Sequence, residues 1–238
     1  MQKILLMLLL PLTLVLSSLS LLSLLQPTPE SLYPTAASQV IKLEVKAKLP
    51  DDPFLHMMLA MFSKLTGRPV PKFLRQSGSG VILDNQGRVV TANHVIEIKD
   101  RLTIVGVTTG GKRFGCRVLS TDDSRDLALL ACDGLIGTRG IRGLASVTLP
   151  IGSRACAAGF ASGGPFILSD GILANRMNDK GKLLLSVPAG PGMSGGAVFT
   201  YDGYLVGIVQ AGYRQPPFTL ITTSNVQLRK FLRDIKYN

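Results

Sequence analysis

The region between residues 78 and 223 consists of short apolar runs separated by turns, and this pattern constrains the fold more than any other feature of the sequence. The turns are rich in Gly, Asp and Asn, as in DNQG at residues 84–87. Many short strands at close spacing predict an all-β protein built as a barrel or a sandwich. The predicted strands carry the sequences GSGVIL, RVVTANHV, RLTIVGV, RFGCRVLS, DLALLAC, ASVTL, ACAAGF, LLLSVPA, YLVGIVQAG and FTLITT.

The segments on either side of this region predict three further elements. A strand is expected at residues 40–45, and residues 50–76 predict a surface loop that contains a short amphipathic helix. The sequence SNVQ at residues 224–227 has the form of a capping box, so we expect a C-terminal amphipathic helix at residues 225–236. Its apolar face, spaced i, i+3, i+4, i+7, consists of Leu228, Phe231, Leu232 and Ile235.

The first 25 residues form a separate hydrophobic segment. Residues 4–25 carry no charge, and at about 1.5 Å per residue they would span roughly 33 Å, enough to cross a bilayer core of about 30 Å. An uncleaved signal anchor fits this length, with Lys3 on the cytoplasmic side. A cleaved signal peptide is the alternative, with small-residue sites at 15–17 or 18–20. Both interpretations export the rest of the chain, and the proline-rich residues 26–36 then predict an extended linker.

The net charge and the residue types exclude some classes of function. Lys and Arg outnumber Asp and Glu by 26 to 15, for a net charge of +11, but the basic residues are scattered. No finger or aromatic RNA-binding motif accompanies them and Trp is absent, so we predict no nucleic-acid partner. A solvated basic surface, or attraction to anionic lipid headgroups or acidic substrates, explains the charge.

The cysteines and histidines do not form a metal-binding pattern. Cys116, Cys132 and Cys156 lack C-x-x-C spacing, and His56 and His94 are the only histidines, so we predict no metal and no cofactor. A hairpin between Cys116 and Cys132 would place the two thiols opposite each other, so a disulfide between them is one alternative. Burial of both as small apolar side chains is the preferred interpretation.

The sequence GPGMSGGAV at residues 190–198 surrounds one serine with small residues. Ser194 is either part of a glycine-rich turn or a nucleophile that substrate can approach closely. A nucleophilic serine needs a base and a group that orients the base. His94, at the end of an apolar run, is the candidate base, whereas His56 is interpreted as a loop residue. Asp126 directly precedes the apolar LALL and is the candidate orienting group.

Three sequences together resemble the trypsin-like serine peptidases, and most closely their HtrA/Deg branch. They are SGSGVILDNQGRVVTANHVI, DSRDLALLAC and GPGMSGGAVFTYDGYLVGIVQAG. The resemblance runs from about residue 37 to residue 235. It implies two six-stranded antiparallel β-barrels with the active site between them. The expected organisation is a signal anchor or signal peptide at 1–25, a linker at 26–36 and a protease domain at 37–238, with barrels at about 37–135 and 145–223.

The resemblance also implies roles for individual residues. Ser194 would attack the substrate carbonyl, His94 would accept the serine proton, and Asp126 would orient His94. The N–H groups of Gly192 and Ser194 would form the oxyanion hole, with help from Met193.

Several positions depart from the family pattern or bear on specificity. Met193 stands where relatives carry Asn or Asp, and Ala197 replaces a usual Pro. No PDZ domain follows, so we expect a protease domain that acts alone. Pro188, expected at the base of the specificity pocket, carries no acid, which favours cleavage after small or aliphatic residues. The expected substrate-pairing strand consists of Gly207, Ile208, Val209, Gln210, Ala211 and Gly212.

The sequence therefore predicts a membrane-tethered serine endopeptidase. It would act on extended or unfolded polypeptides on the periplasmic or extracellular side, as in protein quality control, and would be secreted if the N-terminal segment is cleaved. The resemblance leaves open a homo-trimer formed near Tyr33. The alternative function is a non-catalytic chaperone or peptide-binding module on the same fold.

Overall fold

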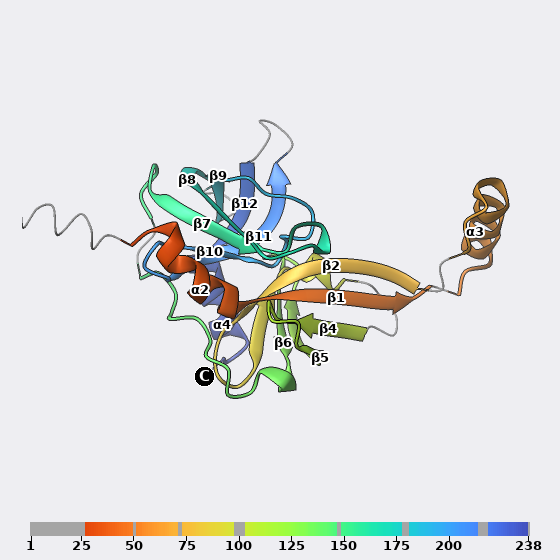
Figure 1. Ribbon diagram of the computed structural model, residues 1–238, viewed down its shortest axis with the longest axis horizontal. Helices are drawn as coiled ribbons and strands as arrows, with labels where there is room; N and C mark the ends of the chain where they lie inside the picture. Colours follow the sequence, from red (N-terminus) through yellow and green to blue (C-terminus); the bar gives the residue numbers. More distant parts are fainter. Residues whose placement is uncertain are drawn as a thin grey trace, which may run out of the picture.

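The computed structural model describes residues 27–49, 51–70, 73–97, 103–146, 149–177, 181–213 and 219–237. Its body consists of two closed β-barrels, and a long two-stranded arm extends from the first of them (Figure 1). This confirms the two six-stranded antiparallel barrels expected from the sequence. The predicted anchor at residues 4–25 lies outside the described residues. Among the described helices, none combines the length and the apolar character that crossing a bilayer requires.

The first barrel closes in the order β1-β2-β3-β6-β5-β4. Strands β1 and β2 run antiparallel well beyond the barrel and form the arm, which carries helix α3 (Pro53–Thr66) between them. The predicted loop helix is thus confirmed. The six strands are β1 (Val40–Lys48), β2 (Phe73–Ile82), β3 (Arg88–Thr91), β4 (Thr103–Val107), β5 (Arg113–Asp122) and β6 (Leu127–Ala131).

The second barrel closes in the order β10-β11-β12-β9-β8-β7. Three sequence assignments change here: ASVTL is not a strand in its described residues, and the apolar runs predicted as strands include neither β8 nor β10. The six strands are β7 (Arg154–Gly159), β8 (Ile167–Met177), β9 (Lys182–Ser186), β10 (Ala197–Phe199), β11 (Leu205–Tyr213) and β12 (Thr219–Ser224).

One apolar cluster joins the two barrels. It combines Leu127 and Val90 of the first barrel with Phe199 and Ile208 of the second. Helix α4 (Asn225–Asp234) covers this cluster with its apolar face, and Phe231 is fully buried. The predicted C-terminal helix is confirmed, although its capping box is only half formed: the Ser224 side chain accepts from Gln227 N. Because the cluster is shared, each barrel fixes the position of the other.

The predicted linker at residues 26–36 is wrong as a description of this segment. Helix α2 (Pro29–Gln39) begins there and buries Leu32 and Ala36 in the shared cluster. Thr28 caps the helix, and Pro29 occupies the first turn, where no N–H is needed. Pro34 lies inside the helix, but the apolar face offsets its cost. The high number of prolines predicted an extended chain, but their positions in this segment still allow a helix.

The preferred interpretation of two cysteines is also wrong. Cys116 and Cys132 form a disulfide that closes the β5–β6 hairpin, with Cα atoms 4.2 Å apart. Cys156 is free and buried, and burial raises the pKa of its thiol to about 12. The hairpin that the sequence left open therefore does bring the first two thiols together.

Candidate active site

His94 and Asp126 lie side by side at the edge of the first barrel. His94 sits in the short turn η1 (Asn93–Val95) after β3, and Asp126 immediately precedes β6, which pairs with β3. His94 Nδ1 lies 2.9 Å from Oδ2 and 3.1 Å from Oδ1 of Asp126. The backbone N–H of His94 donates to Oδ1 at 2.9 Å. One carboxylate thus fixes both the ring and the backbone of the histidine.

Ser194 lies in a tight loop between β9 and β10. A turn precedes it, in which the N–H of Met193 donates to the carbonyl of Gly190 at 3.2 Å. Gly192 has a φ of 90° within this turn, a value that side chains disfavour. A Cβ at Gly192 would lie 2.5 Å from the carbonyl oxygen of Phe160. The glycine is therefore required by both backbone conformation and space.

The loop that carries Ser194 packs directly on the strand that leads to His94. A Cβ at Gly195 would lie 2.1 Å from Thr91 Oγ1 on β3 and 3.1 Å from the backbone nitrogen of Ala92. The two barrels therefore bring the three predicted residues to one junction, although they are far apart in the sequence.

The hydroxyl of Ser194 does not have the partner that the sequence predicted. Ser194 Oγ donates to the carbonyl oxygen of Gln210 at 3.1 Å. The expected bond to the His94 ring is not formed, although both residues are described. Such bonds are often long or misaligned without substrate, and rotation about the Cα–Cβ bond would redirect the hydroxyl.

The backbone next to Ser194 presents two amides that could hold an oxyanion. The carbonyl of Pro191 accepts a bond from Ser162 N, so the N–H of Gly192, across the trans peptide, points the other way. In the part of the chain that the structure describes, neither Gly192 N nor Ser194 N donates to another residue. The expected help from Met193 is wrong, because its N–H is already used in the turn.

Ser79 on β2 connects this loop to the first barrel, a role that no sequence pattern predicted. Its N–H donates to the Ser194 carbonyl at 2.7 Å, and its Oγ donates to the Gly192 carbonyl at 2.9 Å. The same Oγ accepts from Phe160 N at 3.0 Å, and Thr91 Oγ1 donates to the Ser79 carbonyl at 2.7 Å. The side chain is fully buried. Ser79 therefore orients the Gly192–Met193 and Ser194–Gly195 peptide groups.

Gln210 on β11 makes a second bridge between the barrels. Its Nε2 donates to the carbonyls of Arg125 at 2.6 Å and Asp126 at 3.0 Å, and Lys182 Nζ donates to its Oε1. Its own carbonyl accepts from Ser194. Sequence reasoning placed Gln210 only in a substrate strand, because one amide in an apolar run does not reveal its partners.

The residues predicted to contact substrate are only partly available. Pro188 is exposed in the loop after β9, which is not the covered position expected at the base of a pocket. Gly207 and Ile208 are already paired on both sides, with β10 and β12. Residues 207–210 are buried, whereas Ala211 and Gly212 are exposed. The free edge is therefore shorter than the sequence suggested.

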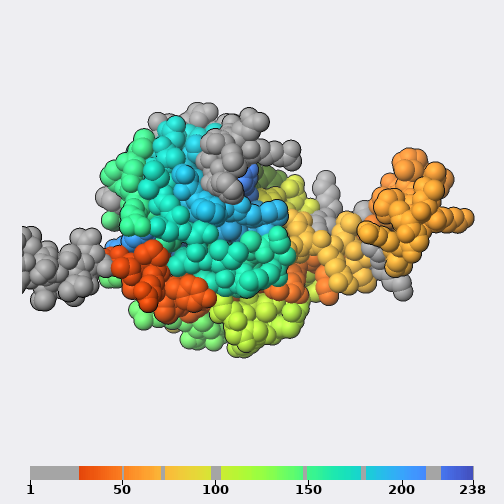
Figure 2. Space-filling view, turned by 45° about the horizontal axis from the view of Figure 1, so that its top comes forward, coloured from red at the N-terminus to blue at the C-terminus, as the bar shows by residue number. Residues whose placement is uncertain are grey.

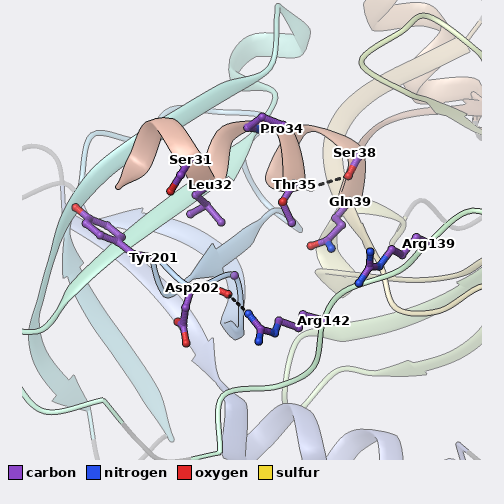
Figure 3. Close-up of a pocket in the computed structure, with 11 residues that line it drawn as sticks. Ser31, Leu32, Pro34, Thr35, Ser38, Gln39, Arg139, Arg142, Tyr201 and Asp202 are labelled. Atoms are coloured by element: carbon purple, nitrogen blue, oxygen red, sulfur yellow. Dashed lines mark hydrogen bonds between the residues drawn. The ribbon is translucent and has the colours of Figure 1, made fainter. Parts of the chain in front are cut away.

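A cavity of about 550 Å³ lies between α2 and two loops, away from these residues (Figure 3). Arg142 donates to the carbonyl of Asp202 at 3.1 Å across it. None of the three predicted catalytic residues lines this cavity. Neither there nor elsewhere in the described ranges do three His, Cys, Asp or Glu side chains form a group that could hold a metal ion. The lining residues are Ser31, Leu32, Pro34, Thr35, Ser38, Gln39, Arg139, Arg142, Tyr201, Asp202 and Gly203.

Comparison with known protein families identifies the family of this chain. The family described as trypsin-like peptidase domain matches residues 78–208, more than half of the chain. The chain belongs to this trypsin-like peptidase family. The match contains His94, Asp126 and Ser194, and it agrees with the resemblance seen in the sequence.

Individual relatives of this trypsin-like peptidase come from the HtrA/Deg branch. A probable periplasmic serine endoprotease, DegP-like, from Pseudomonas putida (strain W619) is 27% identical over 212 residues, covering 76% of this chain and 42% of that protein. The periplasmic serine endoprotease DegP of Escherichia coli (strain K12) is 30% identical over 140 residues, covering 55% of this chain and 29% of that protein. The chain thus spans well under half the length of these relatives.

A solved structure supports the fold. The crystal structure of the serine endoprotease from Yersinia pestis matches with a TM-score of 0.69 and 20% identity, and the match covers 89% of this chain and 67% of that one. The predicted HtrA-type trypsin-like domain is confirmed by these comparisons taken together.

Proposed function

We propose that this chain is a serine endopeptidase in which Ser194 is the nucleophile, His94 the base and Asp126 the orienting group. The observation that carries the proposal is the contact between His94 Nδ1 and the Asp126 carboxylate at 2.9 Å, at the junction where the Ser194 loop packs. A carboxylate on Nδ1 leaves Nε2 free to accept a proton.

The proposed reaction proceeds through an acyl-enzyme. The Ser194 hydroxyl leaves the Gln210 carbonyl, gives its proton to His94 Nε2, and its Oγ bonds to the carbonyl carbon of the substrate. The N–H groups of Gly192 and Ser194 stabilise the oxyanion. His94 then protonates the leaving amine, and water hydrolyses the ester by the reverse sequence of transfers.

Substrate and specificity are part of the proposal. Extended or unfolded polypeptide would add to the exposed end of β11 at Ala211 and Gly212, where backbone groups are accessible. Cleavage after small or aliphatic residues stays a prediction of the sequence, because the exposed Pro188 does not form the base of a covered pocket.

An extracytoplasmic location is likewise proposed, with the anchor or signal peptide at residues 4–25. Disulfides persist in oxidising compartments, and the Cys116–Cys132 bond fits one. Relatives that are named periplasmic support the same location. The homo-trimer near Tyr33 stays a prediction: this ring is 48% exposed and makes an edge contact with Phe166 of its own chain, with centroids 5.5 Å apart.

Labelling with a fluorophosphonate probe tests the proposal, because the probe needs nucleophile, base and oxyanion hole together. The wild-type chain should be labelled and should digest casein. Ser194→Ala should not be labelled, and its kcat should fall by about 10⁶-fold. Ser186→Ala, at an exposed serine at the end of β9, is the matched control and should behave as wild type.

The bond between Ser194 and Gln210 favours one rival, a non-catalytic peptide-binding module. Casein binding by the wild-type chain with neither labelling nor digestion would establish this rival and refute the protease. Labelling that survives in Ser194→Ala would show that another residue is the nucleophile.

A further inference from the structure

Helix α3 carries an apolar stripe that no described part of the molecule covers. The structure buries no residue of this helix, although six of its large apolar residues recur at i, i+3, i+4, i+7, i+8 and i+11. That spacing places them on one face. They are between 48% and 75% exposed, and they are Phe54, Met57, Met58, Met61, Phe62 and Leu65.

Local interactions alone define where this helix begins and ends. The side chain of Asp52 accepts from Phe54 N at 2.8 Å and from Leu55 N at 3.2 Å. At the other end, Gly67 has a φ of 68° and its N–H donates to Ser63 O at 2.9 Å. An isolated helix of 14 residues is marginal in water even with good caps. A surface that covers the stripe would therefore stabilise the helix.

The position of α3 leaves the stripe accessible to a large surface. The helix is joined to the first barrel only through the β1–β2 ribbon and stands apart from the barrels (Figures 1 and 2). The end of the ribbon is also apolar, since Phe73 and Leu74 are 49% and 40% exposed. An extended partner could therefore contact α3 without meeting the barrels.

The charges around the stripe indicate the chemistry of that partner. Exposed cationic residues lie on the helix, just after it and on the ribbon: Lys64, Arg68, Lys46, Lys48 and Arg75. Two aspartates at the start of the helix oppose them, and one of these serves as its cap. An apolar helix face beside an excess of positive charge is typical of helices that lie in the interface of an anionic bilayer. The same positive charge would repel a second copy of the arm.

We propose that α3 inserts its apolar stripe into the headgroup region of an anionic lipid bilayer, with the neighbouring Lys and Arg side chains on the lipid phosphates. The uncharged residues 4–25 would bring the chain to the same bilayer. The arm is thus a second membrane contact, distant in sequence from the first and independent of the peptidase chemistry.

A single tryptophan tests this contact, because the chain contains none. The full-length Met61→Trp protein is reconstituted into phosphatidylcholine vesicles with and without phosphatidylglycerol. In anionic vesicles we expect its emission to shift to shorter wavelength, and acyl chains brominated near the headgroup should reduce it about twofold or more. Neutral vesicles should give a smaller change. The emission reports the place of the helix, whether or not residues 4–25 hold the protein on the vesicle.

Two controls make the test specific. Ala60→Trp places the probe about 100° around the helix from residue 61, away from the stripe, and should be quenched less. Replacing both Lys64 and Arg68 with Glu in the Met61→Trp protein should remove the dependence on phosphatidylglycerol. Phe62→Trp repeats the measurement at a second position of the stripe.

Three outcomes would overturn the proposal. Emission from residue 61 that is unchanged in vesicle-bound protein would show that the stripe does not contact lipid. Equal quenching of the residue 60 and residue 61 probes would show that no defined face inserts. A shift without lipid that grows with protein concentration would assign the stripe to self-association.

Discussion

Two regions of the molecule, the junction between the two barrels and the arm that carries α3, differ in how far their side chains are buried and paired. At the junction, polar groups are buried and paired: Ser79 makes four hydrogen bonds and Gln210 connects both barrels. On the arm, α3 buries nothing and exposes six large apolar side chains. The junction is held by hydrogen bonds within the protein, whereas the arm has an apolar surface that the described protein does not cover.

This difference indicates what each region can do. Buried and fully paired groups hold atoms in place before a substrate arrives, which transition-state stabilisation requires. An exposed apolar face gains stability only from something outside the chain. Substitutions at the junction should therefore affect catalysis or folding, whereas substitutions on the arm should affect neither.

After the loss expected for Ser194→Ala, the largest effect at the junction is that of Asp126→Asn. The new amide would present N–H groups to His94 Nδ1 and force the ring proton onto Nε2, so that the base is blocked. We expect kcat to fall about 10⁴-fold with little change in the melting temperature. Casein hydrolysis and thermal unfolding measure the two quantities.

Asp123→Asn is the matched control for that change. Asp123 accepts from the Asn93 side chain at 2.6 Å and does not touch the imidazole, so activity should stay within a few-fold of wild type. Equal losses in both variants would mean that general charge near His94, rather than contact with Nδ1, determines activity.

Ser79→Ala should give the next largest effect. It leaves the Gly192 carbonyl and Phe160 N without their buried partner, which typically costs about 1–3 kcal/mol of unfolding free energy. The freed Gly192–Met193 peptide should also lower kcat more than it raises KM. Ser77→Ala, two residues away on the same strand, should change neither, because the Ser77 side chain makes no hydrogen bond to a described residue. A loss of stability with an unaltered kcat would show that Ser79 does not position the oxyanion-binding amides.

Most of the fold could be predicted from sequence, but the linker and the disulfide could not. Short apolar runs are local signals, and they predicted the positions of ten of the twelve barrel strands without tertiary information. The helix at Pro29 depends on burial of Leu32 and Ala36 against the second barrel, which no local pattern contains. Pairing of Cys116 with Cys132 depends on the strand register across the hairpin.

At the candidate site, the residues were predictable but their contacts were not. His94, Asp126 and Ser194 could be chosen because few residues can perform each role and the motifs follow in order. Ser79 and Gln210 act through buried hydrogen bonds to backbone groups that are distant in sequence. A serine or glutamine inside a strand gives no sign of such partners, so only the structure identifies them.

A weaker effect is expected where the arm leaves the barrel. Glu44 bonds to Arg113 at 2.6 Å and to Lys42 at 3.1 Å, and the hydrogen bond from Arg113 is the main reason why the pKa of Glu44 falls to about 2. The stabilisation is complete above the ordinary pKa of 4.5 and is lost as the pH falls towards about 2.

Glu44→Gln should therefore lower the free energy of unfolding by about 0.2–1 kcal/mol at neutral pH, because the pair is partly exposed. The difference from wild type should shrink below the ordinary pKa of Glu44. Urea denaturation across this range measures it, with Glu97→Gln at an exposed site as the control. A difference that does not vary with pH would show that the ion pair is not its source.

The smallest expected effect belongs to the tip of the arm, and it tests the contrast with the junction most directly. Phe62, 57% exposed on α3, and Phe231, fully buried on α4, can both be changed to Ala. Phe231→Ala should cost about 3–5 kcal/mol of unfolding free energy in lipid-free protein. Phe62→Ala should stay within about 0.5 kcal/mol of wild type, because more than half of this residue is already exposed. Urea denaturation of both variants without vesicles measures the difference. A large loss in Phe62→Ala would mean that the chain itself covers the stripe in solution, so that the arm is a folded part of the core rather than a surface for a partner.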